Sequence, residues 1–393
     1  MNARDVIKKK PRIAIVTSIH PDFDARIWKH ATSLARSGYN IHLICPWAVD
    51  EGAVIEGVSF HPFARVIERR KRFFLVPIRV WGKLKPLMET IDIVHFHDID
   101  LLPWMALLCT KKHVVYDVHE NYPEEMLIKE WIPVLLRKPL SRIVSIGQRF
   151  LASIIRNVVL VVDSQDPDFD HPRINKVHIW NYASVKLLES VADDYMERQE
   201  CIIFTGTHYV ANGSLLLMEI MERLHKLRPA LKLMITDGMF SQEVSRELML
   251  EEVTKRGLQD AVIFVPRVNS QEIMTVLNRA TVAIVPVLRV PKAIRGVPNK
   301  LFEYMAAGLP VVSSDLPYQE KIIKNSQAGY LARPEDPDSF VVAIQKLLDD
   351  KDLALDMGKN GQKIFQHRYS WEGQLPRLLA FYDAIFFKEA GRA

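Results

Sequence analysis

This sequence is poor in cysteine and has no long apolar run. Its three cysteines, Cys45, Cys109 and Cys201, lie far apart and form no Cys-x-x-Cys pair. We therefore expect neither a disulfide framework nor a cysteine-based zinc site. No apolar run reaches the roughly 18 to 20 residues of a membrane-spanning helix. The first residues lead from a basic tail into a strand without the apolar stretch of a signal peptide, so we expect a cytoplasmic protein.

The overall amino-acid composition is typical of a soluble globular protein. Hydrophobic residues make up 48% of the chain and charged residues 25%. A length of 393 residues suits two domains of roughly 180 to 200 residues each. The formal net charge of +5 is mildly basic and favours anionic partners. The net charge alone does not decide whether the partner is a nucleic acid, an anionic membrane surface or a phosphorylated small molecule.

Short runs rich in valine and isoleucine alternate with helical stretches along the whole chain. They occupy residues 12–18, 40–46, 92–98, 113–119 and 157–164, and then 201–207, 231–237, 261–267, 280–286 and 309–315. Strands separated by helices indicate parallel sheets covered on both faces. We predict an α/β protein with two Rossmann-like domains facing a central cleft, in which ligands bind beyond the carboxyl ends of the strands. The predicted parts are residues 1–182, a linker at 183–200, residues 201–368, and a C-terminal helix at 369–393 that packs back toward the N-terminal domain.

The stretch RGVPNKLFEYMAAGLPVVSSD, residues 295–315, combines a turn, a helix and a strand. Gly296 and Pro298 end any preceding helix, and a new helix is expected from Asn299 to a stop at Gly308. The backbone N–H groups at such a helix start suit a phosphate. Lys300 adds positive charge there, and Glu303 lies on the same side, where it can accept hydrogen bonds from two sugar hydroxyls. Alternatively, Lys300 and Glu303 form an ordinary surface pair.

The segment EYMAAGLPVVSSD resembles the donor-binding signature of glycosyltransferase family 4, the retaining sugar-nucleotide transferases of GT-B fold. In this resemblance Glu303 takes the place of the glutamate that holds the nucleotide ribose. The glutamate that the family carries eight positions earlier, near the reacting carbon, is replaced here by Arg295. The pattern P-N-K-x-x-E-Y-M is typical of a subgroup, and it implies a variant donor site. Within that site the diphosphate is expected on the backbone N–H groups of Asn299, Lys300 and Leu301.

A second departure from the family lies in the segment GTHYVANGS, which begins at the end of the predicted strand at 201–207. Gly206 and Gly213 match the family pattern, but Thr207 and Asn212 replace the arginine and lysine that clamp the donor diphosphate. Neutral hydrogen bonds from Thr207 and Asn212 remain available. The missing positive charge must then come from Lys300, Arg295 or Arg267. The competing interpretation is an ordinary strand–turn–helix connection.

The N-terminal half carries polar residues at the ends of three predicted strands. In the loop HPDFDAR, His20 and Arg26 are candidates for binding phosphate or acceptor, while Asp24 is expected to cap the next helix. His119 and Glu120 end a later strand, and the resemblance implies that His119 touches the donor sugar or the acceptor hydroxyl.

A third strand ends in HFHDID, which contains His95, His97 and Asp98. Its alternating histidines share one face of the strand, but we expect too few further ligands for a metal ion. Asp98 is expected to cap the helix that follows.

Residues 65–91 are rich in arginine and lysine with interleaved aromatic residues, and residues 131–157 have a similar character and are a candidate for lining the acceptor side. Such a stretch can lie on an anionic bilayer or follow a nucleic acid, or it can be a helix with a solvated cationic face. No nucleic-acid-binding fold accompanies them. We therefore expect peripheral membrane contact and no nucleic acid.

The resemblance implies a metal-independent, retaining glycosyltransferase of hexosyltransferase type without a cofactor. Its substrates would be a nucleotide-sugar donor and a lipid-linked or saccharide acceptor in bacterial cell-surface polysaccharide or lipopolysaccharide biosynthesis. His119, Lys300 and Glu303 are the expected catalytic residues. Two alternatives stay open: a sugar-nucleotide epimerase of similar two-domain fold, and a nucleotide-sugar-binding subunit that has lost catalysis.

Overall fold

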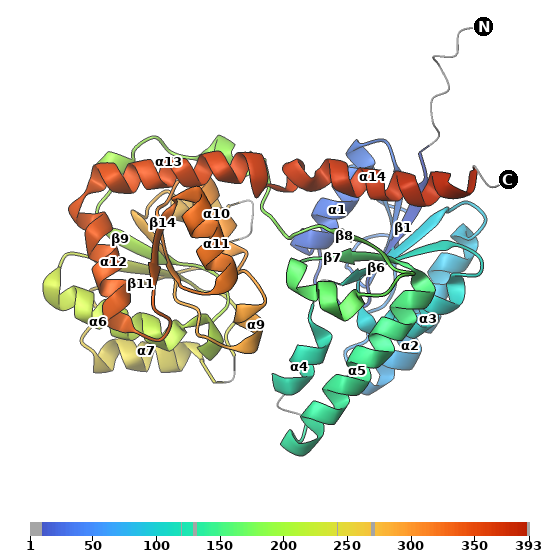
Figure 1. Ribbon diagram of the computed structural model, residues 1–393, viewed down its shortest axis with the longest axis horizontal. Coiled ribbons are helices and arrows are strands. Elements are labelled where there is room, and N and C mark those ends of the chain that lie inside the picture. Colours follow the sequence, from blue (N-terminus) through green and yellow to red (C-terminus); the bar gives the residue numbers. More distant parts are fainter. Residues whose placement is uncertain (1–9, 119, 129–131, 242, 269–271, 391–393) are drawn as a thin grey trace, which may run out of the picture. The chain divides into compact units, whose positions relative to one another are not determined.

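The computed structural model describes residues 10–118, 120–128, 132–241, 243–268 and 272–390. The chain divides into two compact units, residues 1–181 with 375–393 (unit 1) and residues 182–374 (unit 2). Each unit is a twisted sheet flanked by helices (Figure 1). The helix α14, Trp371–Ala390, starts in unit 2 and continues into unit 1.

Unit 1 is built around an eight-stranded sheet of order β3-β4-β2-β1-β5-β6-β7-β8. Its strands are parallel except for the β3–β4 pair. Besides α14, its elements are β1 (Arg12–Val16), α1 (Ala25–Arg36), β2 (Asn40–Cys45), β3 (Val54–Ile55), β4 (Val58–Pro62), α2 (Arg69–Leu84), β5 (Ile93–Phe96), α3 (Leu102–Leu108), β6 (His113–Val118), α4 (Tyr122–Ile128), α5 (Val134–Ile155), β7 (Asn157–Leu160) and β8 (Asn175–His178).

Unit 2 is built around a six-stranded parallel sheet of order β11-β10-β9-β12-β13-β14. Its elements are β9 (Cys201–Phe204), α6 (Ser214–Leu227), β10 (Lys232–Thr236), α7 (Arg246–Lys255), β11 (Val262–Val265), α8 (Ile273–Leu277), β12 (Val282–Val285), α9 (Pro291–Ile294), α10 (Lys300–Ala306), β13 (Val311–Ser314), α11 (Pro317–Ser326), β14 (Gly329–Ala332), α12 (Pro337–Asp349) and α13 (Lys351–Arg368).

The predicted α/β class with parallel sheets is confirmed, and each predicted run contains a strand. The short strands β3, β4, β8 and β14 were not predicted, because they lie outside the runs that the composition marks as strands. Residues 183–200, predicted as a linker, are part of unit 2. There the Tyr195 hydroxyl donates to the carbonyl oxygen of Thr281 at 2.7 Å, and Arg198 Nη1 donates to that of Ala280 at 3.1 Å.

The two faces of the unit 1 sheet differ in polarity. Alternate residues such as Val94, Phe96 and Tyr116 enter a continuous apolar core with α2, α3 and α5. The opposite face carries polar side chains beneath α1 and α14, which both lie on this side of the sheet (Figure 1). Because side chains alternate along a strand, His95 shares this polar face with the next alternate residue, His97.

Candidate functional site

The turn after β9 in unit 2 has a conformation that requires glycine. Gly206 and Gly213 have φ values of +97° and +78°, and a Cβ on Gly213 would lie 1.9 Å from the carbonyl oxygen of Pro286. Between them, Asn212 Nδ2 donates to both the carbonyl oxygen and the hydroxyl of Thr207, each at 2.9 Å. Thr207 and Asn212, which replace the arginine and lysine of the family pattern, therefore stabilise the turn by hydrogen bonds to each other.

Helix α10 is fastened to the start of this turn by a buried tyrosine. The Tyr304 hydroxyl accepts the backbone N–H of Thr205 at 2.8 Å and lies 3.1 Å from the Thr205 hydroxyl. At the other end, Gln362 Nε2 donates to the carbonyl oxygen of Ala306 at 3.1 Å. Gly308, with a φ of +69°, follows the last turn, which confirms the predicted stop.

Lys300, the first residue of α10, lies over the turn. Its Nζ is 3.6 Å from the ring centroid of Phe204, and a Cβ placed on Gly206 would lie 3.5 Å from Lys300 Cε. Burial lowers the pKa of Lys300 to about 7, although the charge of Glu303 acts to raise it. The half-buried Glu303 lies on the same short helix. The structure therefore brings Lys300 to Gly206 and places Glu303 one turn further along the same helix.

The backbone at the start of α10 corrects one predicted contact. The N–H of Leu301 donates to the carbonyl oxygen of Pro298 at 3.1 Å, and the Leu301 side chain is buried. Leu301 therefore already uses the N–H group that was assigned to the diphosphate. Asn299 is exposed immediately before the helix, and its carbonyl oxygen accepts from Phe302 at 3.0 Å.

The other two predicted cations lie on different connections. Arg295 is half-buried directly after α9, on the same β12–α10 connection that leads to Lys300. Arg267 is exposed two residues beyond β11, which β10 separates from β9 in the sheet. The contacts of Lys300 with Phe204 and Gly206 join it to the turn.

In unit 1, His20 lies between two carboxylates. Its Nδ1 is 3.3 Å from Asp24 Oδ2, and its Nε2 is 3.3 Å from Asp98 Oδ1. Burial alone would lower the pKa of His20, but the hydrogen bonds and charges of Asp24 and Asp98 outweigh it and raise the pKa to about 10. The ring is therefore an imidazolium at neutral pH and is unsuited to act as a general base.

The two aspartates beside His20 had both been predicted as helix caps. Asp24 caps α1, because its side chain accepts from the backbone N–H groups of Arg26 and Ile27. The prediction for Asp98 is wrong. Its Oδ2 instead accepts from the Ser18 N–H at 2.6 Å and the Thr17 hydroxyl at 3.0 Å, which fastens the end of β1 to the end of β5.

Arg26, predicted to meet an anion in the loop, points into unit 1 instead. It is 5% exposed, its Nη2 donates to Asp117 Oδ1 at 2.8 Å, and its Nη1 donates to the carbonyl oxygen of Ile179 at 3.0 Å. A guanidinium with these internal partners is directed away from a ligand in the loop. Burial would raise the pKa of Asp117, but Arg26 and the neighbouring histidines hold it well below its usual range.

The remaining predicted residues of unit 1 follow β6. His119 lies outside the described residues. Glu120 is half-buried and lines a small hollow together with Asn121, Ser145, Gln148, Gln165 and Asp168.

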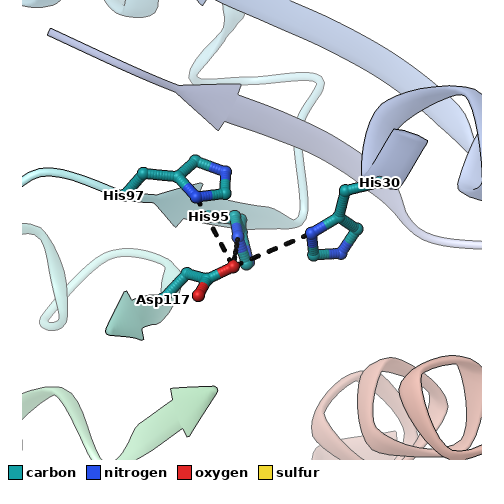
Figure 2. Close-up of side chains that lie close together, drawn as sticks. All are labelled: His30, His95, His97 and Asp117. Carbon is teal, nitrogen blue, oxygen red and sulfur yellow. Dashed lines mark ion pairs between the residues drawn. The ribbon is translucent and has the colours of Figure 1, made fainter. Parts of the chain in front are cut away.

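A group of side chains that the sequence did not predict lies on the polar face of unit 1. His95 and His97 were expected to lack further ligands, but the structure places His30 of α1 and Asp117 of β6 against them (Figure 2). All four side chains are fully buried. The register of β5 and β6 was the available signal, since pairing Phe96 with Tyr116 places the following residues, His97 and Asp117, side by side.

The two halves of the chain match two family models. Residues 25–164 match the model described as Glycosyltransferase Family 4, and residues 194–364 match the model described as Glycosyl transferases group 1. In the part of the chain that the structure describes, every helix is too short or too polar to cross a bilayer.

Similar curated proteins share only a segment with this chain. An uncharacterized glycosyltransferase, MJ1607, from Methanocaldococcus jannaschii is 26% identical over 44% of this chain and 42% of its own length. D-inositol 3-phosphate glycosyltransferase from Corynebacterium urealyticum is 25% identical over 39% of this chain and 35% of its own length. The matched segment thus spans less than half the length of each of these relatives.

Similar solved structures cover nearly the whole chain and show its fold. Sucrose-phosphate synthase from Thermosynechococcus elongatus has a TM-score of 0.75 at 16% identity, over 95% of this chain and 99% of its own. Anabaena Alr3699/HepE, solved in complex with UDP and glucose, has a TM-score of 0.70 at 13% identity, over 94% of this chain and 99% of its own. The fold is GT-B.

Proposed function

We propose that this chain, which belongs to the GT-B glycosyltransferases through its family 4 and group 1 domains, is a retaining enzyme that transfers a sugar from a nucleotide-sugar to an acceptor hydroxyl. The observation that carries the proposal is the position of Lys300 beside Gly206, with Glu303 one turn further along α10. A cation and a carboxylate at a glycine turn suit the diphosphate and the ribose of such a donor.

Each group in this arrangement has a proposed role. Glu303 accepts hydrogen bonds from the ribose hydroxyls, and Lys300 contacts the diphosphate. Negative charge grows on the diphosphate as it leaves, so a fixed ammonium stabilises the transition state without a metal ion. Retention follows if the acceptor attacks from the face of the leaving phosphate, which then takes the acceptor's proton. Arg295 and His119 are the proposed contacts to the donor sugar or acceptor.

Replacement of Glu303 by glutamine tests the donor site. Because hydrogen bonds to a charged group contribute about 1.5–3 kcal/mol, Glu303→Gln is expected to weaken nucleotide affinity roughly 10- to 100-fold. Affinity is measured by calorimetry with the diphosphate that gives the largest thermal shift among UDP, GDP and ADP. Glu320→Gln, on the nearby α11, is the matched control because its partner Lys324 is a surface residue. Unchanged nucleotide affinity and transfer in Glu303→Gln would contradict the placement of the ribose.

The two alternative functions give different products. The wild-type protein is incubated with its nucleotide-sugar without acceptor, and the sugar is followed by NMR. Transfer predicts that the sugar configuration stays unchanged, whereas an epimerase would produce a second sugar-nucleotide. A protein that binds the donor but never releases nucleotide, with lipid-linked or soluble saccharide acceptors present, would be a binding subunit.

We further propose that the acceptor is lipid-linked and that unit 1 rests on an anionic bilayer. Helix α5 exposes an apolar stripe, Ile143, Ile146, Phe150 and Ile154, whose members are between 39% and 65% exposed. Their spacing places them on one face of the helix. The helix contains four basic residues and no acidic one. An apolar stripe with basic flanks is the pattern of a helix that lies in a membrane surface.

Helix α2 adds exposed apolar side chains of the same kind, including Phe74 and Ile78. It also carries six basic residues and no acidic one. The resemblance to family 4 described above implies an enzyme that builds lipopolysaccharide or another surface polysaccharide on a lipid carrier. A peripheral enzyme of such a pathway, on the inner face of the plasma membrane, is the role we assign.

Vesicle sedimentation tests this surface. The wild-type protein is expected to sediment with vesicles that contain phosphatidylglycerol and to remain in solution with pure phosphatidylcholine. Ile146→Glu is expected to reduce sedimentation, whereas Val342→Glu, an exposed apolar position of unit 2, serves as the control. Equal sedimentation of both variants, or none by the wild type, would refute membrane attachment through α5.

A further inference from the structure

Three histidines of unit 1 direct a nitrogen toward one carboxylate oxygen (Figure 2). Asp117 Oδ2 lies 3.4 Å from His95 Nε2, 3.4 Å from His97 Nδ1 and 3.9 Å from His30 Nδ1. One nitrogen from each ring and one carboxylate oxygen all lie within 4.8 Å of one another. The group joins α1, β5 and β6 in a part of the core that solvent does not reach.

The hydrogen bonds of Tyr382 restrict where the protons of two of these rings can lie. The Tyr382 hydroxyl lies 3.1 Å from His30 Nε2 and 2.8 Å from His95 Nδ1. A hydroxyl has one proton, so it donates to one ring and accepts an N–H from the other. If neutral, the ring that donates to Tyr382 has no proton on its second nitrogen. That nitrogen then presents a lone pair to the ionised Asp117, which is repulsive unless a cation lies between them.

We propose that this cluster, His30, His95, His97 and Asp117, binds one divalent transition-metal ion of the zinc type. The donor set of three imidazoles and one carboxylate matches the preference of zinc, cobalt and nickel rather than that of calcium or magnesium. Tetrahedral zinc with bonds of about 2.0–2.1 Å requires ligand atoms about 3.3 Å apart. Two of the three distances to Asp117 Oδ2 are already close to that value, and the ion would draw His30 inward.

Tyr382 then has the role of the outer hydrogen-bond partner of two ligands. Metal-bound histidines almost always use their second ring nitrogen in such a bond, which fixes the tautomer and the ring orientation. With four protein ligands no coordination position remains for a substrate. We therefore assign the ion a structural role, separate from sugar transfer and from the site at Lys300.

Arg26 limits the affinity of this site. Its guanidinium contacts both oxygens of Asp117, at 2.8 Å for Oδ1 and 3.0 Å for Oδ2. A second cation on the same carboxylate repels the metal ion and competes for its ligand. We therefore expect weaker binding than in a structural zinc site made of cysteines, so that the metal must be supplied in the experiment.

Cobalt binding to the full-length protein tests the proposal without reference to enzymatic activity. The chain is purified without a histidine tag, treated with EDTA, dialysed and titrated with cobalt(II). The expected result is binding of about one ion per chain, with the intense visible bands of tetrahedral cobalt, and a higher Tm. Zinc is expected to displace the cobalt and abolish the bands. Absence of binding, or weak bands of octahedral type, would overturn the proposal.

Variants distinguish this cluster from adventitious binding at the surface. His95→Gln and His97→Gln are each expected to abolish the tetrahedral bands. The matched control is His42→Gln, which removes a half-buried pair outside the cluster: His42 Nδ1 lies 3.0 Å from His61 Nε2, next to Glu51. Bands that survive in His95→Gln and His97→Gln but disappear in His42→Gln would overturn the assignment. The stoichiometry and spectrum of the wild type decide the question even if a core variant does not fold.

Discussion

Replacement of Lys300 by methionine is expected to stabilise the ligand-free protein and to weaken its affinity for a nucleoside diphosphate. The stabilising effect follows from the pKa, which burial lowers from 10.5 to about 7. Such a shift corresponds to roughly 5 kcal/mol at most. Partial access of water to the side chain reduces this to about 2 kcal/mol. Methionine keeps the length of the side chain and removes the buried charge.

The sign of the pH dependence follows from the two states of the lysine. Its folded-state pKa is lower than its unfolded-state pKa, so the cost of burying the charge is complete below about pH 7 and disappears as the pH rises toward about 10.5. Lys300→Met is therefore expected to raise Tm clearly at pH 6 and much less at pH 9. Differential scanning calorimetry of both proteins at the two pH values measures this difference.

The effect on binding has the opposite sign. Loss of a charge-assisted contact of about 1.5–3 kcal/mol is expected to weaken the diphosphate complex roughly 10- to 100-fold. A bound diphosphate also raises the pKa of Lys300. At pH 8, the wild type should consequently take up about 0.9 proton on binding, measured by calorimetry in buffers of different ionisation enthalpy. A variant that binds as tightly as the wild type, with the same proton uptake, would refute the assigned role of Lys300.

Three further perturbations test other parts of the structure. Gly213→Ala is expected to destabilise unit 2 strongly through a backbone clash, whereas Gly257→Ala, which also has a positive φ but open space around it, should cost only about 1–2 kcal/mol in urea unfolding. Tyr304→Phe leaves the N–H of Thr205 without its partner, so we expect a loss of about 1–3 kcal/mol and weaker nucleotide binding by calorimetry. The ring of His20 should stay protonated at pH 8 in NMR spectra, and a neutral ring there would contradict the paired carboxylates.

Local pattern was sufficient to predict the alternating architecture and the association of Lys300 with Glu303. Strand runs, the stop at Gly308 and the cap at Asp24 depend on neighbouring residues, so they are visible in the sequence. The partner of Arg26 is not, since Asp117 is 91 residues away and comes close only when α1 packs on β6. The same long-range packing assembles the histidine cluster.

The errors at Asp98 and Leu301 have related causes. An aspartate before a helix is a frequent cap, but here the ends of two adjacent strands compete for its carboxylate. An N–H near the start of a helix is often available to a ligand, but the tight turn at Pro298 uses it. Both outcomes depend on the path of the backbone in three dimensions, which residue type alone does not determine.

The return of α14 to unit 1 has a consequence for how the protein is made. Tyr382, which hydrogen-bonds to two buried histidines, follows all the described strands of both units in the sequence and is translated after them. During translation the polar face of the unit 1 sheet therefore stays without α14 until the strands of unit 2 have been made. A fragment that stops at residue 181 lacks this cover, so any attempt to produce the N-terminal domain by itself needs the C-terminal helix attached.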